Sequence, residues 1–145
     1  MQDTPQPPRY LPDANMFVAA VKNATRETDT LRLLLALLED PLIELVGGAI
    51  LFAEFERAAA AFPSPMAAGL LHAIAERLTV VEPDEGVIAA CAPFFSGDAA
   101  SDIVHAATCL KSGATLISND HDFDAIVRAG LIRRLTLTEA VRRLL

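Results

Sequence analysis

The chain has 145 residues, of which 52% are apolar and only 6% aromatic, and it contains no tryptophan. This length suits one domain with an aliphatic core. Twelve basic residues against 19 acidic ones give a net charge of −7, which argues against a protein that binds nucleic acid simply through a positive surface. A nuclease is still compatible with this charge, because divalent ions held by acidic side chains reverse the local field.

Three features indicate a reduced, cytoplasmic protein that does not enter a membrane. Cys91 and Cys109 are the only cysteines, and they are far apart and lack the spacing of a metal site. The first nine residues contain no apolar signal core. Residues 58–75 are free of charge but are interrupted by prolines and a glycine, so we expect helix, turn and helix there rather than a membrane span.

The first half of the chain begins with a polar, proline-rich segment, residues 1–8, which we expect to be a disordered lead-in. A single domain is then expected over residues 9–145. Its first elements alternate between strand and helix: strand 9–12, helix 14–21, polar turn 23–29, helix 30–39, strand 42–46, helix 49–62 and helix 65–78. Ser64 is the expected cap of the helix that begins with Pro65.

The second half continues the same alternation. The expected elements are strand 79–81, helix 84–92, loop 93–97, a helix from 102 to 112, strand 115–118, helix 121–128, strand 131–135 and a terminal helix to 144. Gly113 supplies the left-handed residue that ends a helix, and Thr136 with Glu139 forms a capping box for the last one. The pattern predicts an α/β fold with a mainly parallel sheet covered by helices on both faces.

Acidic residues mark the ends of these elements. Asp13 and Asp120 each follow an expected strand, and Asp102 begins the helix before the strand that leads to Asp120. In open α/β sheets, sites form outside the carboxyl ends of the strands. Asp102 shares its helix side mostly with apolar residues and has no lysine or arginine close by in sequence, so a proton or a metal should accompany it. Glu54, in a mostly apolar helix, is a fourth candidate.

Convergence of these acids would require a cation. Two carboxylates ~4 Å apart repel by roughly 4 kcal/mol at an effective dielectric constant of about 20. Several such pairs would rival the whole stability of a domain, which is on the order of 5–15 kcal/mol. Because the ligands would all be oxygen atoms, Mg²⁺ or Mn²⁺ is expected rather than zinc.

The acids lie in four short motifs. These are Leu11-Pro12-Asp13-Ala14-Asn15, Leu51-Phe52-Ala53-Glu54-Phe55, the helix from Asp102 to Gly113-Ala114, and Ser118-Asn119-Asp120-His121-Asp122-Phe123. From Tyr10 onward, the sequence resembles PIN-domain nucleases, the family that includes VapC-type toxins of bacterial toxin–antitoxin pairs. The last two motifs, joined at the family's spacing, are the specific part. Ala14, in place of the family's hydroxyl residue, and Pro12, directly before Asp13, depart from its pattern.

The resemblance implies a three-layer α/β/α sandwich that cleaves RNA with Mg²⁺ or Mn²⁺. Four acids would be both catalytic residues and metal ligands: Asp13, Glu54, Asp102 and Asp120. Asn15 and Ser118 would orient carboxylates by hydrogen bonding, and Asp122 would be an outer ligand. Proteins of this family usually form homodimers and are held inactive by a small antitoxin protein that inserts into the acidic groove, so the resemblance implies both for this chain.

Several alternatives compete with this interpretation. Glu44 and Glu56 rival Glu54 as the second acid, and Asp13 could merely cap its helix. His105 and His121 are left without a role, because a lone histidine beside acids is more often a hydrogen-bonding helper or a solvated residue. Two other functions remain open: a PIN-fold protein that binds RNA or a partner without cleaving, and a metal-dependent phosphatase or phospho-acceptor that uses Asp13 as nucleophile.

Overall fold

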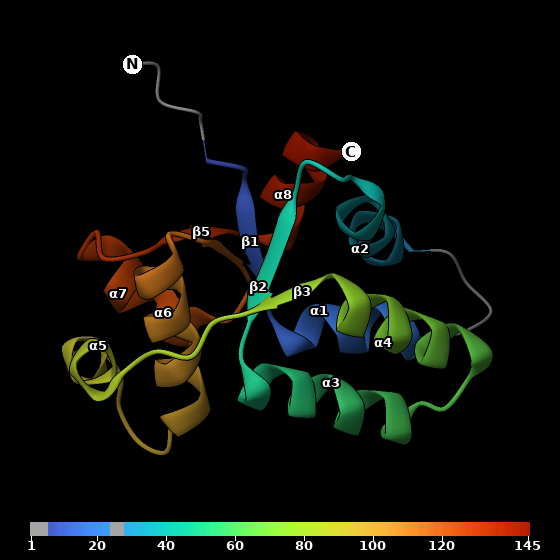
Figure 1. Ribbon diagram of the computed structural model, residues 1–145. Helices are drawn as coiled ribbons and strands as arrows, with labels where there is room; N and C mark the ends of the chain where they lie inside the picture. Colours follow the sequence, from blue (N-terminus) through green and yellow to red (C-terminus); the bar gives the residue numbers. More distant parts are fainter. Residues whose placement is uncertain (1–5, 24–27) are drawn as a thin grey trace.

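A five-stranded parallel sheet forms the centre of the protein (Figure 1). The computed structural model describes residues 6–23 and 28–145, so residues 1–5 of the expected lead-in and residues 24–27 of the expected polar turn lie outside it. The strands run in the order β3 (Leu78–Val80), β2 (Glu44–Gly47), β1 (Arg9–Pro12), β4 (Thr115–Ile117), β5 (Arg133–Leu135). All the pairings are parallel, which confirms the predicted α/β class.

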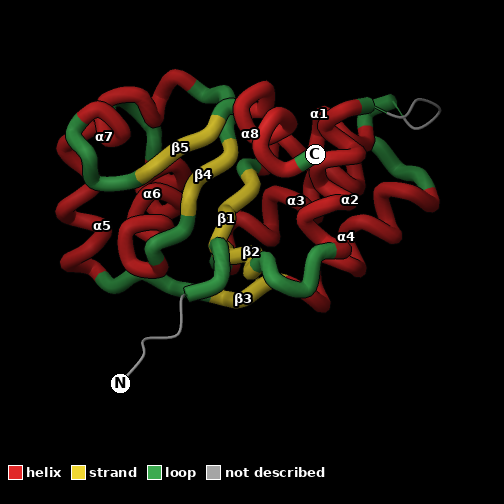
Figure 2. Tube along the Cα trace, turned by 90° about the horizontal axis from the view of Figure 1, so that it is seen from above, coloured by secondary structure: helices red, strands yellow, loops and turns green. Residues whose placement is uncertain are grey.

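Helices cover both faces of this sheet, as the three-layer prediction requires. In chain order they are α1 (Ala14–Val21), α2 (Asp29–Glu39), α3 (Ala49–Ala61), α4 (Pro65–Arg77), α5 (Glu85–Cys91), α6 (Ala100–Ser112), α7 (Asp124–Arg128) and α8 (Leu137–Leu144). Figure 2 shows α5, α6 and α7 on one side of the sheet and α1, α2, α4 and α8 on the other. Helix α3 packs against α1, α4 and α6.

The expected helix boundaries are set by the predicted capping residues. Ser64 accepts a hydrogen bond from the Ala67 amide at 3.0 Å, with Pro65 in the first helical turn. Thr136 and Glu139 form the reciprocal capping box. Gly113 ends α6 with φ of 75°, a left-handed conformation that glycine adopts without strain. Gly113 therefore sets the carboxyl end of α6, the helix that carries Asp102 in its first turn.

Three expected elements differ most from the structure. The helix predicted at 121–128 is divided into a short 3₁₀ turn, η2 (His121–Phe123), and α7, because the Asp120 carboxylate accepts the Asp122 amide at 2.9 Å and tightens the first turn. A second 3₁₀ turn, η1 (Ala92–Phe94), begins the segment 93–97 that was expected to be a loop. The last strand starts two residues later than expected, at Arg133.

The core is aliphatic, as the composition predicted. Leu11, Leu45 and Leu116, in three neighbouring strands, are fully buried. Phe17 and Phe55 join α1 to α3 through rings whose centroids are 5.4 Å apart. Strand β1 occupies the centre of the sheet, and Pro12 is tolerated there because it is the last residue of the strand.

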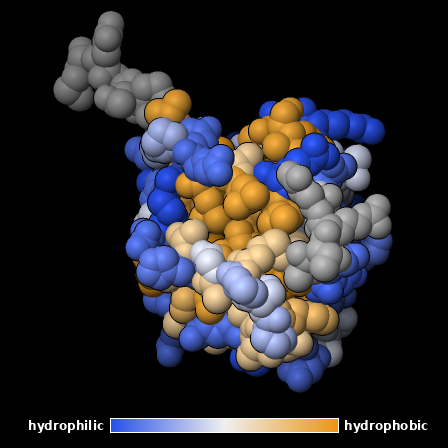
Figure 3. Space-filling model, turned by 90° about the vertical axis from the view of Figure 1, so that its right-hand side faces the viewer, coloured by the Kyte–Doolittle hydropathy of each residue, from blue (hydrophilic) through white to orange (hydrophobic). Residues whose placement is uncertain are grey.

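One side of the molecule carries an apolar groove between α2 and α4. It measures about 380 Å³, and leucines and small residues dominate its lining: Leu31, Leu35, Leu38, Glu39, Met66, Gly69, Leu70 and Ala73. Figure 3 shows apolar surface exposed on this side of the molecule. Among the helices of residues 6–23 and 28–145, none is long and apolar enough to span a bilayer.

Candidate active site

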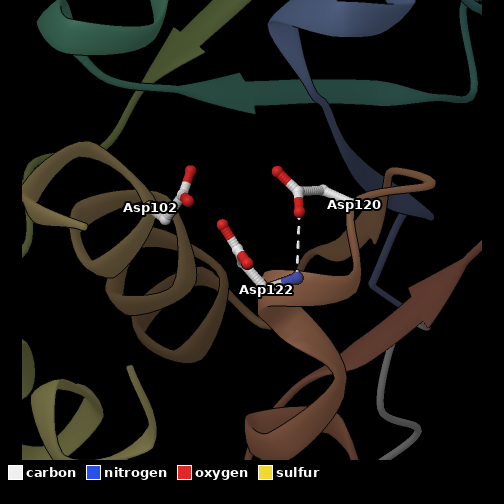
Figure 4. Close-up of side chains that lie close together, drawn as sticks. All are labelled: Asp102, Asp120 and Asp122. Atoms are coloured by element: carbon white, nitrogen blue, oxygen red, sulfur yellow. Dashed lines mark hydrogen bonds between the residues drawn. The ribbon is translucent and has the colours of Figure 1, made fainter. Parts of the chain in front are cut away.

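Three carboxylates meet where the central strands end (Figure 4). Asp102 lies in the first turn of α6, Asp120 follows β4, and Asp122 lies in η2. One carboxylate oxygen from each lies within 4.8 Å of the others, and the side chains point toward a common space. The β4 strand and the tight turn after it bring Asp120 and Asp122 to the same point. Asp102 reaches this point from the first turn of α6, the helix that precedes β4.

Asp13 is joined to this cluster through a buried hydroxyl. It directly follows β1, and its backbone amide donates to the Ile117 carbonyl at 3.0 Å. Ser118 Oγ donates to Asp13 Oδ2 at 2.6 Å and accepts the Asp120 amide at 3.0 Å. Asp13 is only 7% exposed, and the Ser118 hydroxyl is the hydrogen-bond donor that holds its carboxylate beside the acidic cluster.

Glu54 is held by a histidine that the sequence analysis left without a role. Glu54 lies in α3, and its Oε1 contacts Nε2 of His105, which lies one turn beyond Asp102 in α6 and is 2% exposed. The competing acids lie elsewhere: Glu56 is exposed, and Glu44 forms an ion pair with Arg9 at the amino ends of the strands. The spacing of three residues from Asp102 was the only sequence signal for His105.

The remaining expected helper, Asn15, is exposed in the first turn of α1. Within residues 6–23 and 28–145, its side chain makes no hydrogen bond to a carboxylate. Asp122, expected as an outer ligand, lies inside the three-carboxylate cluster, whereas Asp13 and Glu54 lie outside it. The structure therefore brings Asp102, Asp120 and Asp122 into one cluster and places Asp13 and Glu54 outside it, and the roles predicted for these acids stay predictions.

Burial and mutual repulsion change the acidity of these groups. Burial, followed by the charges of Asp120 and Asp13, raises the pKa of Asp102 to about 6. Burial also raises the pKa of Asp13, with a smaller contribution from Glu54, although the Ser118 hydrogen bond and His105 oppose this rise. The surroundings of Asp102 and Asp13 thus disfavour their anionic forms, which is the electrostatic condition that a bound cation relieves.

The donor set fits a hard divalent cation. In the part of the chain that the structure describes, no lysine or arginine forms an ion pair with Asp102, Asp120 or Asp122. The available ligand atoms in this cluster are carboxylate oxygens, which Mg²⁺ and Mn²⁺ prefer, and thiolate and imidazole donors favoured by zinc are not part of it. Cys91 and Cys109 are both buried free thiols of the core.

The sequence match to a protein family identifies the family of this chain. Residues 10–129 match the PIN domain family. The chain belongs to that family. No curated protein matches the sequence, so the family assignment rests on the domain match, and solved structures add the spatial comparison. The match contains all four motifs in which the candidate acids lie.

Three solved structures with a similar fold come from bacteria and share low sequence identity with this chain. VapBC2 from Rickettsia felis, bound to a DNA fragment from its promoter, is 15% identical with a TM-score of 0.62, and the alignment covers 88% of this chain and 98% of that one. VapBC-1 from nontypeable Haemophilus influenzae is 20% identical with a TM-score of 0.59, covering 90% and 98%. FitAcB from Neisseria gonorrhoeae is 21% identical with a TM-score of 0.56, covering 89% and 98%. These likenesses confirm the α/β/α fold.

Proposed function

We propose that this PIN-domain protein is a metal-dependent endoribonuclease that acts as the toxin of a toxin–antitoxin pair. The observation that carries the proposal is the cluster of Asp102, Asp120 and Asp122, whose oxygens lie within 4.8 Å of one another without a cationic partner among the described residues. A cluster of this kind at the carboxyl ends of parallel strands suits a divalent ion better than a structural ion pair. The family assignment points to nuclease chemistry.

Each residue has a distinct task in this proposal. Asp102 and Asp120 bind Mg²⁺ or Mn²⁺, and Asp122 completes the set from the exposed side. Asp13, oriented by Ser118, and Glu54, oriented by His105, add negative charge behind these ligands and position bound water. Asn15, exposed at the start of α1, is placed to hydrogen-bond a water or phosphate oxygen. When bound, the ion supplies Lewis-acid stabilisation of phosphate charge and a more acidic water.

A small antitoxin is the partner that the surface supports. The acidic cluster attracts an arginine or lysine side chain, which would replace the cation and silence the site. The apolar groove between α2 and α4, with Leu35 36% exposed, offers a docking surface for an amphipathic segment of such a protein. We further propose that the protein is cytoplasmic and forms a homodimer. Light scattering of the purified protein measures its mass in solution and thereby tests the homodimer.

Cleavage of unstructured RNA in Mg²⁺, Mn²⁺ or EDTA tests the central proposal. The wild type is expected to cut in either metal and to stop in EDTA, and Asp102→Asn is expected to lose activity in all three conditions. Cleavage that persists in EDTA and in the variant would refute a metal mechanism at these acids. RNA binding with no cleavage in any condition would instead identify a PIN-fold binding protein. A phospho-acceptor role is disfavoured by Asp13, whose carboxylate is buried and hydrogen-bonded.

A further inference from the structure

We propose that a hollow beside the acidic cluster is a nucleobase subsite, which binds an unpaired base next to the phosphodiester that is cleaved. This inference rests on the proposed function, because it names how that site holds its substrate. The hollow measures about 270 Å³ and lies between the segment after α5 and the start of α7. Aromatic and polar side chains line it: Phe94, Phe95, Ser96, His121, Asp122 and Arg128.

The hollow adjoins the acidic cluster, because Asp122 belongs to both. This residue lines the hollow and also contributes an oxygen to the cluster with Asp102 and Asp120. Figure 4 shows its carboxylate directed toward the cluster, while its amide is fixed by the Asp120 side chain. A nucleotide whose phosphate lies at the cluster therefore has its sugar and base within reach of the hollow.

The aromatic wall of the hollow is formed before any ligand binds. The Phe95 ring packs edge-on against Phe123, with centroids 5.8 Å apart and planes at 85°. Phe123 is fully buried in the core, so it holds Phe95 in place from behind. The volume lies just below the ~300–1,000 Å³ of sites for drug-sized ligands, so the hollow suits one flat ring system rather than a peptide segment.

The chemistry of the lining suits an unpaired base. Single-stranded RNA is recognised by bases that stack on aromatic side chains or on arginine and form hydrogen bonds along their edges. Phe94 and Phe95 supply aromatic surface, and Ser96 and Arg128 supply donors at the rim. His121 also lines the hollow; it is 92% exposed and contacts Asp124 Oδ2 through Nδ1 at 3.0 Å.

Binding of neutral nucleosides, with ribose as the ligand without a base, tests the subsite without requiring cleavage. Protein amide shifts, recorded by nuclear magnetic resonance in EDTA, report both affinity and location. We expect adenosine, cytidine, guanosine or uridine to bind at least roughly fivefold more tightly than ribose, with shifts concentrated in residues 94–99 and 121–128. Equal binding of ribose and of all four nucleosides, or shifts confined to other segments, would overturn the proposal.

Matched variants locate the stacking surface. Phe94→Leu keeps an apolar side chain and removes the aromatic face, so the ratio of nucleoside to ribose affinity should fall from at least roughly fivefold toward about one. Phe62→Leu, an exposed phenylalanine after α3 that does not line the hollow, is the control and should retain the advantage. His121→Ala is a second variant on an exposed side chain and should weaken nucleoside binding even if Phe94→Leu fails to fold. An unchanged advantage in His121→Ala and in folded Phe94→Leu would refute the subsite.

The outcome is separable from that of the proposed function. Loss of the nucleoside advantage in the variants, together with absent RNA cleavage by the wild type, would support a base-binding subsite in a protein that is not a nuclease. Metal-dependent cleavage with no nucleoside advantage would support the nuclease and overturn the subsite.

Discussion

The two edges of the sheet, one at the amino ends and one at the carboxyl ends of its strands, differ in how their charged side chains are paired. At the amino ends of the strands, Arg9 donates to Glu44 at 2.8 Å and to the Ser112 carbonyl at 2.7 Å, and Arg133 donates to the Gly113 carbonyl at 3.1 Å. At the carboxyl ends, Asp102, Asp120 and Asp122 crowd together, and among the described residues no arginine or lysine forms an ion pair with their carboxylates, although Arg134 donates to the Asp120 carbonyl at 3.0 Å. The same chain therefore pairs its charges at the amino ends of the strands and leaves three carboxylates without an ion-pair partner at the carboxyl ends, where a proton or a cation would relieve their repulsion.

The largest expected difference between the edges is in metal affinity. Asp102→Asn removes one charge from the cluster while keeping the shape of the side chain. Loss of a residue that only hydrogen-bonds a metal ligand weakens metal binding about 10–100-fold. Because Asp102 is itself an expected ligand, we expect its substitution to weaken Mn²⁺ binding on the order of 100-fold. Calorimetric titration of the metal-free protein measures this. The control is Asp98→Asn, an exposed acid before α6 that lies outside the cluster. If both variants bind Mn²⁺ like the wild type, the cluster is not the metal site.

A smaller effect is expected at Ser118, which links two acids without belonging to the cluster. Ser118→Ala removes the hydroxyl that donates to Asp13 and accepts the Asp120 amide. We expect about 10–100-fold weaker Mn²⁺ binding and a loss of about 1–3 kcal/mol of unfolding free energy, because the Asp13 carboxylate stays buried with one partner fewer. Calorimetry and urea unfolding measure the two effects.

Ser112→Ala is the matched control for this change at the opposite edge. Ser112 Oγ donates to the Thr108 carbonyl at 2.7 Å, far from the acids in the fold. We expect it to leave Mn²⁺ affinity unchanged. Equal losses of metal affinity in both serine variants would mean that Ser118 acts only through stability.

The acidic edge was predictable from the sequence only in part. Apolar periodicity, the glycine after α6 and the four motifs were enough to assign Asp13, Asp102 and Asp120 to the ends of strands and helices that converge. The alternation of elements also indicated parallel strands, but it contains no information that places β1 at the centre of the sheet.

What the sequence could not supply depends on contacts between distant segments. His105 meets Glu54 across 51 residues, and only the packing of α3 against α6 creates that contact. Asp122 enters the cluster because a single hydrogen bond to Asp120 tightens the turn into η2, a feature that a helical pattern over 121–128 conceals. Side-chain pairs of this kind follow from tertiary geometry, which periodicity does not encode.

The dependence of stability on pH provides a third test of the unpaired edge. Asp102 has a pKa near 3.8 in the unfolded chain, which burial and its neighbours raise to about 6 in the folded protein. The folded state thus binds the Asp102 proton more tightly than the unfolded state does, and this tighter binding stabilises the fold. The stabilisation is complete below the unfolded pKa of 3.8 and is lost as the pH rises through the folded pKa of about 6. In EDTA, Asp102→Asn should therefore be more stable than the wild type by about 1–2 kcal/mol at about pH 7, and by less at about pH 5.

Thermal unfolding at the two pH values measures this difference, and added Mn²⁺ should reverse it. The ion binds the deprotonated wild-type site and stabilises it, whereas the variant gains little. Asp98→Asn should follow the wild type under every condition. A wild type that gains stability over Asp102→Asn between about pH 5 and pH 7 without metal would contradict the sign of the pKa shift.

The smallest expected effect lies at the paired edge. Glu44→Gln removes the charge that Arg9 neutralises, but both side chains are partly exposed, at 24% and 31%, and Arg9 keeps its bond to the Ser112 carbonyl. Ion pairs of this exposure contribute about 0–1 kcal/mol, so we expect urea unfolding to change by less than about 1 kcal/mol. Because Arg9 and Glu44 lie at the end of the sheet away from the cluster, Mn²⁺ affinity should not change. A loss of metal affinity comparable to that of Ser118→Ala would mean that the two edges are coupled through the strands, and the contrast between them would then describe one connected charge network.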